Sequence, residues 1–78
     1  MTDQQPKTID YRSRPDDELV RFAQGGENRA FDELVRRYQD KVYRLCYKIL
    51  RHEDDAAEAM QDAFLSAYRG LKNFKAES

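Results

Sequence analysis

The longest regular pattern of hydrophobic positions in this chain lies between residues 31 and 49. Its apolar side chains recur every three or four residues, which places them along one face of an α-helix. They are Phe31, Leu34, Val35, Tyr38, Val42, Leu45, Cys46 and Ile49. We therefore predict a long amphipathic helix that begins at Glu27 or Asn28.

A shorter helix is predicted just before it. Pro15 and the three acidic residues 16–18 are typical of a first helical turn. Proline loses no hydrogen bond at that position, and carboxylates there face the positive end of the helix dipole. The pair Gly25-Gly26 should end this helix, because glycine adopts the left-handed cap conformation without a side-chain clash.

A third helix should begin at Asp54 or Asp55, where a carboxylate can cap free backbone N–H groups. Its inward side chains again follow steps of three and four residues. They are Ala56, Met60, Ala63, Phe64, Ala67, Leu71 and Phe74. We predict an all-α fold, a small three-helix bundle over residues 14–78. The polar, aperiodic residues 1–13 are expected to form a flexible N-terminal arm.

Length and composition exclude several classes of protein. The chain has 78 residues, 37% of them charged and 40% hydrophobic, which suits one small helical domain. No apolar run approaches the roughly 20 residues that cross a bilayer, and residues 1–6 lack the features of a signal peptide. We therefore expect a cytoplasmic protein without membrane insertion.

The sequence offers no evident chemistry for catalysis or metal binding. Its one cysteine, Cys46, lies in the apolar stripe of the long helix, so we interpret it as a small buried hydrophobe. Cys46 and His52 alone do not supply a zinc site. The lone histidine has no matched nucleophile, and the paired acids lie at helix starts. We expect no cofactor, no metal and no enzymatic activity.

The third helix carries an acidic sector beside its apolar stripe. At 100° per residue this sector contains Ala57, Glu58, Gln61, Asp62, Leu65 and Tyr68. Apolar side chains among carboxylates and an amide are typical of a protein-binding surface for a basic helical partner. The alternative is an ordinary surface, in which Asp55 and Glu58 form a capping box and Leu65 is a scattered apolar residue.

The long helix carries a basic stripe. Its members are Arg37, Lys41, Arg44, Lys48 and Arg51, at steps of four, three, four and three residues. Such a stripe could follow phosphates, and the nearby Tyr43 and Tyr47 could stack on unpaired bases. The alternative is a solvated face that is partly neutralised by Asp40 and the acids at 53–55. The stripe is therefore also a candidate nucleic-acid-binding site.

Two motifs give the chain a family resemblance. The Gly-Gly turn followed by AFDELVRRY resembles the start of region 2 of sigma-70 family sigma factors of the extracytoplasmic-function (ECF) group. The segment DAAEAMQDAF resembles the polymerase-binding helix of that region. The resemblance runs from about Asp16 to Ser78. The family usually has aspartate, a larger aliphatic residue and glutamate where this chain has Glu58, Ala59 and Asp62.

The resemblance implies that the third helix binds the clamp helices of the β′ subunit of RNA polymerase. The implied contacts, with Leu65 added from the acidic sector, are Ala57, Glu58, Gln61, Asp62, Phe64, Leu65 and Tyr68. In this family, promoter DNA is a partner of the full-length protein, and an anti-sigma factor is a further possible partner. The implied function is transcription initiation. The alternatives are a helical protein–protein adaptor and a weak, non-specific nucleic-acid-binding module.

The family continues beyond the part that this sequence resembles. A helix that melts and reads the −10 promoter element follows, and a C-terminal helix-turn-helix reads the −35 element. Neither segment is present in these 78 residues. We therefore expect a fragment or an incomplete gene product, which would not initiate from a specific promoter by itself.

Overall fold

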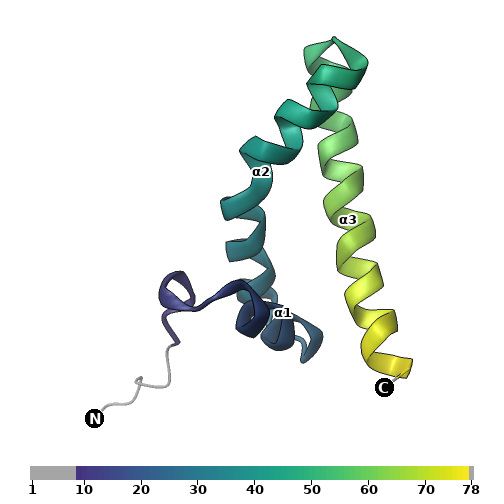
Figure 1. The fold of residues 1–78 in the computed structure, drawn as a ribbon. Helices are drawn as coiled ribbons and strands as arrows, with labels where there is room; N and C mark the ends of the chain where they lie inside the picture. The colour runs from purple at the N-terminus through teal and green to yellow at the C-terminus, as the bar shows by residue number, and fades with distance from the viewer. Residues whose placement is uncertain (1–8, 78) are drawn as a thin grey trace.

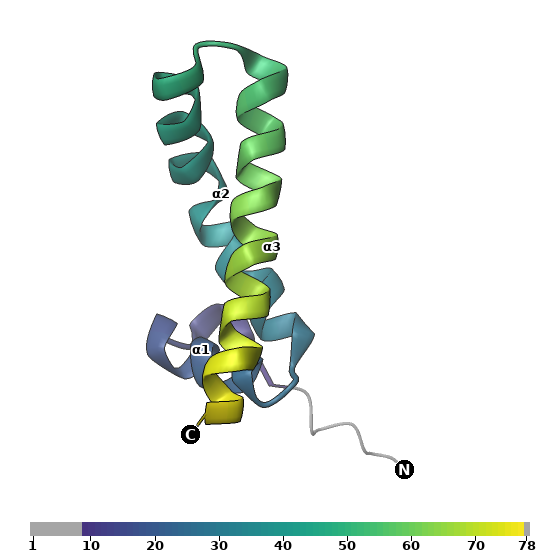
Figure 2. The same ribbon diagram turned by 90° about the vertical axis from the view of Figure 1, so that its right-hand side faces the viewer.

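The computed structural model describes residues 9–77, with side chains described through residue 73. In chain order these residues form a short 3-10 helix, η2 (Tyr11–Ser13), and three α-helices: α1 (Asp16–Gln24), α2 (Asn28–Leu50) and α3 (Glu53–Glu77). α2 and α3 form a long antiparallel hairpin, and α1 lies across its lower end (Figure 1). A view from the side shows the same arrangement (Figure 2). The predicted all-α, three-helix architecture is confirmed.

The predicted end of the first helix is correct, and its start lies one residue later than predicted. Pro15 occupies the N-cap position with extended backbone angles, and Asp16, Asp17 and Glu18 fill the first turn of α1. At the other end, the Gly26 N–H donates to the Ala23 carbonyl and the Glu27 N–H to the Phe22 carbonyl. This pair of hydrogen bonds is the Schellman motif, which requires a residue in the left-handed conformation. Gly26 supplies it with a φ of 100°.

The core lies where the three helices meet. Leu19 and Ala23 from α1 and Ala30 from α2 are buried and in contact with one another. Partly buried side chains pack around them from every element, namely Tyr11, Phe22, Phe31, Leu34 and Leu71. Small residues at the contact let helix backbones approach closely. At the opposite end of the hairpin, Ala56 is fully buried as well.

The apolar stripes are less buried than periodicity predicts. Leu45 is 59% exposed and Ile49 is 72% exposed, and on α3 both Ala63 and Ala67 are exposed. α1 packs only near the start of α2, so the distal half of the hairpin consists of two helices rather than three (Figure 1). Cys46 is partly rather than fully buried for the same reason. The side chain of Phe74 lies outside the described residues.

The end of the expected flexible arm is folded against the bundle. Tyr11 packs edge-on against Phe22, with ring centroids 5.6 Å apart, and its hydroxyl donates to a Glu27 carboxylate oxygen at 2.9 Å. Residues 11–13 therefore belong to the folded part of the chain. The prediction of a flexible arm that extends to residue 13 was wrong for these residues. The sequence did not predict this contact, because the partners of Tyr11, Phe22 and Glu27, lie 11 and 16 residues later in the chain. Residues 1–8 lie outside the described part.

The turn between α2 and α3 is shorter than predicted. Arg51 closes α2 in the left-handed conformation, with φ 58°, and its N–H donates to the Tyr47 carbonyl at 2.7 Å. The Ala56 N–H then donates to the His52 carbonyl, so α3 begins at Glu53. The prediction that Asp54 or Asp55 caps this helix was wrong, because Arg51 completes the reversal before either residue.

Candidate functional site

A groove opens between the first turns of α2 and the middle of α3. It has a volume of about 430 Å³ and is open to solvent. Four residues of the predicted binding set, Gln61, Phe64, Leu65 and Tyr68, line its α3 side. The α2 side is lined by Asn28, Phe31 and Asp32. The structure therefore gathers most of the predicted α3 residues around one cavity.

Tyr68 joins the two walls of this groove. Its hydroxyl donates to the Asn28 side-chain oxygen at 2.7 Å, and its ring meets Phe31 edge-on at a centroid distance of 5.1 Å. The Lys72 ammonium lies 5.0 Å from the centre of the same ring, a favourable cation–π distance. Three contacts thus fix the orientation of Tyr68, which presents a preformed wall to a partner.

The floor and rim of the groove differ in polarity. Phe64 is partly buried and lines the groove, so it serves the helix packing and the surface at once. Leu65 is 49% exposed at the rim. Gln61 is exposed beside them and offers both a donor and an acceptor. The groove therefore combines an apolar floor with polar groups that can fix the register of a partner.

The remaining predicted residues flank the groove on α3. Glu58 and Asp62 are exposed, and neither forms an ion pair within the described part of the chain. Ala57 is partly buried. α3 begins at Glu53, which places Glu58 beyond the first turn and excludes the alternative Asp55–Glu58 capping box. Asp55 lies instead near His52, with Nδ1 and Oδ2 3.9 Å apart.

The sequence did not predict three of the residues that line the groove as part of a binding site. They are Asn28, Phe31 and Asp32. Asn28 was assigned only to the start of a helix and Phe31 only to the core. They share the groove with α3 residues that are 29 to 40 positions later in the chain. No local sequence pattern predicts such a contact, because it depends on how far α2 and α3 are shifted lengthwise relative to each other.

Arg37 belongs to an ion-pair network rather than to an open basic stripe. Its Nη1 donates to Asp16 Oδ1 at 2.7 Å and its Nε to Glu33 Oε2 at 3.0 Å. Its Nη2 donates to the carbonyl oxygens of Tyr11, Arg12 and Arg14. Arg37 therefore ties η2 and α1 to α2. These hydrogen bonds within the chain disfavour the predicted nucleic-acid contact at Arg37, which stays a prediction.

The same network shifts the ionisation of two carboxylates. Glu33 is only 7% exposed and accepts hydrogen bonds from Arg36 and Arg37, which lower its pKa to about 2. The pKa of Asp16 is also lowered, first by a hydrogen bond from the Tyr38 hydroxyl and then by Arg37. These hydrogen bonds stabilise the ionised form of each carboxylate. Both groups therefore remain anionic at neutral pH.

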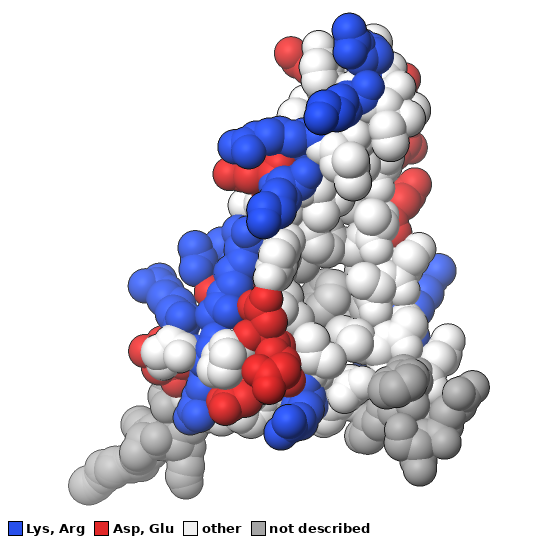
Figure 3. Space-filling model, viewed as in Figure 1, with Lys and Arg blue, Asp and Glu red and all other residues white. Residues whose placement is uncertain are grey.

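The other four residues of the predicted basic stripe are exposed. They are Lys41, Arg44, Lys48 and Arg51. A band of Lys and Arg follows α2 up to the turn in the space-filling view (Figure 3). Beside it, the Tyr43 and Tyr47 rings are stacked, with centroids 6.3 Å apart and planes 22° apart. The structure thus separates these four cations from the groove on α3.

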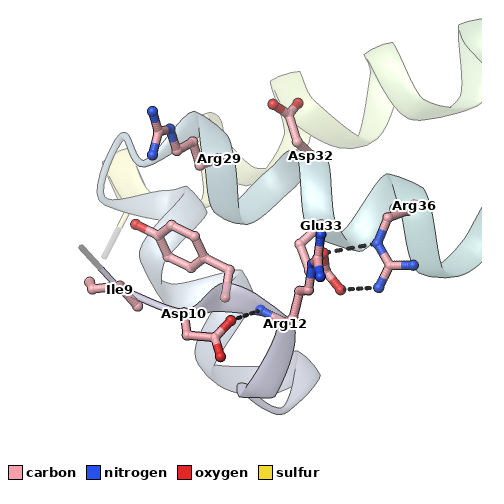
Figure 4. A pocket seen from close by; sticks show the side chains of 8 residues that line it. Ile9, Asp10, Arg12, Arg29, Asp32, Glu33 and Arg36 are labelled. Atoms are coloured by element: carbon pink, nitrogen blue, oxygen red, sulfur yellow. Dashed lines mark hydrogen bonds and ion pairs between the residues drawn. The ribbon is translucent and has the colours of Figure 1, made fainter.

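A second cavity lies beside η2 and has a volume of about 540 Å³. Its lining mixes basic and acidic side chains, and the Glu33 carboxylate is bound by Arg36 (Figure 4). The Arg12 backbone N–H donates to the Asp10 carboxylate at 3.2 Å in the same place. The charges largely compensate one another, so this cavity has no clear selectivity for an anion or a cation.

Within the described part of the chain, no three side chains of the His, Cys, Asp or Glu type are grouped as metal ligands would be. None of the described helices is both long enough and apolar enough to span a bilayer.

Comparison with known proteins supplies the family context. The profile of the family described as Sigma-70 region 2 matches residues 34–78. The chain is 41% identical to the RNA polymerase sigma-H factor of Pseudomonas aeruginosa over 63 residues, which cover 81% of this chain and 33% of the relative. It is 42% identical to the ECF RNA polymerase sigma factor SigM of Mycobacterium tuberculosis over 62 residues, covering 80% and 32%.

A third relative gives a similar result. The ECF RNA polymerase sigma-E factor of Escherichia coli is 40% identical over 63 residues, which cover 81% of this chain and 32% of that protein. The chain therefore spans about a third of the length of the curated relatives that it matches. No solved structure gives a significant match.

Proposed function

Because the chain belongs to the sigma-70 region 2 family and its relatives include ECF sigma factors, we propose that it binds the RNA polymerase core through α3 in transcription initiation. This role is one of binding rather than catalysis. The relatives are about three times longer than the matched segment, so promoter recognition by the whole protein belongs to the same proposal. Binding to polymerase would also place the chain in the cytoplasm.

The observation that supports this proposal is the α3 groove with its acidic margin. Glu58, Gln61, Asp62 and Leu65 lie within two turns, and Gln61 and Leu65 border an apolar floor. Apolar side chains of a partner helix can enter the groove, while exposed carboxylates attract basic side chains and set the register. Tyr68 is already held in place, so little side-chain entropy is lost on binding.

The partner that fits this surface is a helical, basic element of the polymerase. From the resemblance to the family, we assign that element to the clamp helices of the β′ subunit. Ala57, which is partly buried, would set how closely the partner helix approaches. An anti-sigma factor could compete for the same groove, because a single apolar floor with one acidic margin admits one helix at a time.

The direct test is a pull-down of core RNA polymerase with the 78-residue chain and with two variants, Glu58→Lys and Gln61→Ala. We expect the wild-type chain to bind and each variant to lose about 2 kcal/mol or more, as at a central interface residue. Asp17→Lys on α1 and Gln39→Ala on α2 are matched controls, because both sites are exposed and lie outside the groove.

The controls decide how the result is interpreted. Binding that Glu58→Lys and Gln61→Ala leave intact would exclude α3 as the polymerase contact. Equal losses in Asp17→Lys and Gln39→Ala would indicate a non-specific electrostatic or folding effect. Absence of any binding to core polymerase would favour the adaptor hypothesis instead.

A further inference from the structure

The large hydrophobic side chains that remain exposed gather on two surfaces of the α2–α3 hairpin. Among the residues that the structure describes, five such side chains are 42% to 72% exposed. Four of them, Leu45, Tyr47, Ile49 and Leu50, lie in the last two turns of α2, and the fifth is Leu65 at the α3 groove. Exposed apolar side chains that cluster among polar ones are typical of protein-binding surfaces. The distal part of α2 is therefore a second candidate for a protein contact.

On the distal part of α2, a row of apolar side chains lies beside a row of basic ones. Leu45 and Ile49 are four residues apart, so they lie one above the other on the same side of the helix. Lys41, Arg44 and Lys48 follow the neighbouring side at steps of three and four residues. All five side chains are exposed, and we call them the distal face. The distal face offers apolar contact area together with positive charge.

The exposed part of α3 has the same layout with the opposite charge. Gln61 and Leu65 form one row along the groove, and Glu58 and Asp62 form the row beside it, each pair four residues apart. We call these four residues the acidic face. The two faces match in spacing and in charge, and both matches favour the packing of one helix on the other. The chain therefore carries a basic helix of the kind that its own α3 surface fits.

The two faces cannot meet within one copy of the chain. Asp32 lines the α2 wall of the groove, and Lys41 follows it by nine residues, or about two and a half turns. The groove and the distal face therefore lie on opposite sides of α2. In the upper half of Figure 3, the Lys and Arg side chains along α2 and the Asp and Glu side chains of α3 lie along opposite edges of the hairpin. A contact between the two faces must join two copies.

We propose that the chain associates with itself head to tail, with the distal face of one copy packed on the acidic face of the next. Each copy uses α2 toward one neighbour and α3 toward another, so the contact is heterologous and the assembly can grow beyond a dimer. This association does not require polymerase. One consequence rests on the proposed function: where α3 is the polymerase contact, a second copy and the polymerase compete for it.

The rows also determine how the two helices align. The apolar rows and the charged rows meet at the same time only when α2 and α3 run in the same direction. The register that places Lys48 opposite Asp62 also places Arg44 opposite Glu58, because both pairs differ by 14 in residue number. The same register inserts Ile49 into the apolar row of α3. The part of α2 that carries α1 then lies beyond the start of α3, so α1 does not block the contact.

Sedimentation equilibrium of the 78-residue chain tests the proposal over about 10–500 µM, where a weak contact becomes populated. We expect the weight-average mass to rise with concentration past twice the monomer mass. It should fall as salt is raised to about 1 M, because exposed charges are then screened. Ile49→Ser should lower the association constant about tenfold by removing apolar contact area. Leu50→Ser makes the same change on another side of α2 and should leave it unchanged.

Charge reversal identifies the two faces. Lys48→Glu and Asp62→Lys should each lower the association constant about tenfold or more, because each places like charges together. An equimolar mixture of these two variants should associate again, because the exchanged charges meet across the contact. Arg21→Glu and Asp17→Lys change the net charge equally at exposed sites of α1, so alone and mixed they should behave as the wild type does. Circular dichroism checks that every variant is folded.

The pull-down of core polymerase separates this proposal from the proposed function. Lys48→Glu should lose self-association and retain polymerase binding, whereas Asp62→Lys should lose both. A chain that stays monomeric up to about 500 µM would overturn the proposal and leave the distal face to a different protein. A mass that levels off at the dimer would exclude the head-to-tail contact. A mixture of the two reversed variants that stays monomeric, or equal losses in the α1 controls, would also contradict it.

Discussion

The hydroxyl of Tyr68 in α3 donates a hydrogen bond at 2.7 Å to the side chain of Asn28 at the start of α2. The two residues are 40 positions apart, and their contact fixes the offset between the long helices at the groove. The geometry of the proposed binding site thus depends on a polar contact that also contributes to the fold. Substitutions at Tyr68 can separate these two contributions.

Tyr68→Phe removes the hydroxyl and retains the ring. We expect the free energy of unfolding to fall by about 0.5–1.5 kcal/mol, the usual net value of one hydrogen bond. Polymerase binding should persist, because the ring still packs on Phe31. Tyr68→Ala should abolish binding by removing a wall of the groove. Urea unfolding and the pull-down measure the two effects, and equal binding by both variants would contradict the assigned wall.

Leu19 and Leu45 should respond very differently to truncation. Leu19 is fully buried, so Leu19→Ala should cost about 2–5 kcal/mol, enough to unfold much of so small a domain. Leu45 is 59% exposed, and Leu45→Ala should change stability by less than about 0.5 kcal/mol. Circular dichroism during urea unfolding compares them. A large loss for Leu45→Ala would show that another surface covers the distal half of α2.

Protonation of Glu33 should destabilise the fold in acid. Its pKa is about 2 in the folded chain, against an ordinary value of 4.5. A carboxyl group with a lower pKa in the folded than in the unfolded chain stabilises the fold. This stabilisation is complete above about pH 4.5 and is lost as the pH falls toward 2. Glu33→Gln should therefore be less stable at neutral pH but less sensitive to pH in that window. Thermal unfolding at several pH values checks this, and a variant profile parallel to the wild type would contradict it.

Arg51 adopts a left-handed conformation, with φ 58°, that costs most residues free energy. Arg51→Gly should relieve this strain, but glycine also loses more backbone entropy on folding. We expect a net gain in stability of at most about 1 kcal/mol. Arg51→Val should destabilise, because a β-branched side chain tolerates this conformation poorly. Urea midpoints measure both, and a Val variant as stable as Gly would contradict the backbone argument.

The sequence predicted the helices and their faces well, because those features depend on neighbours three or four residues away. The Gly25-Gly26 cap, the start of α1 just after Pro15 and the periodic stripe of α2 are local in this sense. The α3 residues of the candidate site followed from the same periodicity and from the family resemblance. Four of them, Gln61, Phe64, Leu65 and Tyr68, line one groove.

The sequence could not determine where each face would find a neighbour. An apolar stripe shows that a side of a helix can be buried, but only the lengths and crossing of the helices decide how much of it is. Leu45 and Ile49 are therefore exposed, and Arg37 binds Asp16 and Glu33 instead of solvent. The contact of Asn28 with Tyr68 is non-local in the same way. The local pattern of apolar, polar and capping residues determines the helices of this chain. Tertiary packing determines which charged and aromatic side chains remain free to bind a partner.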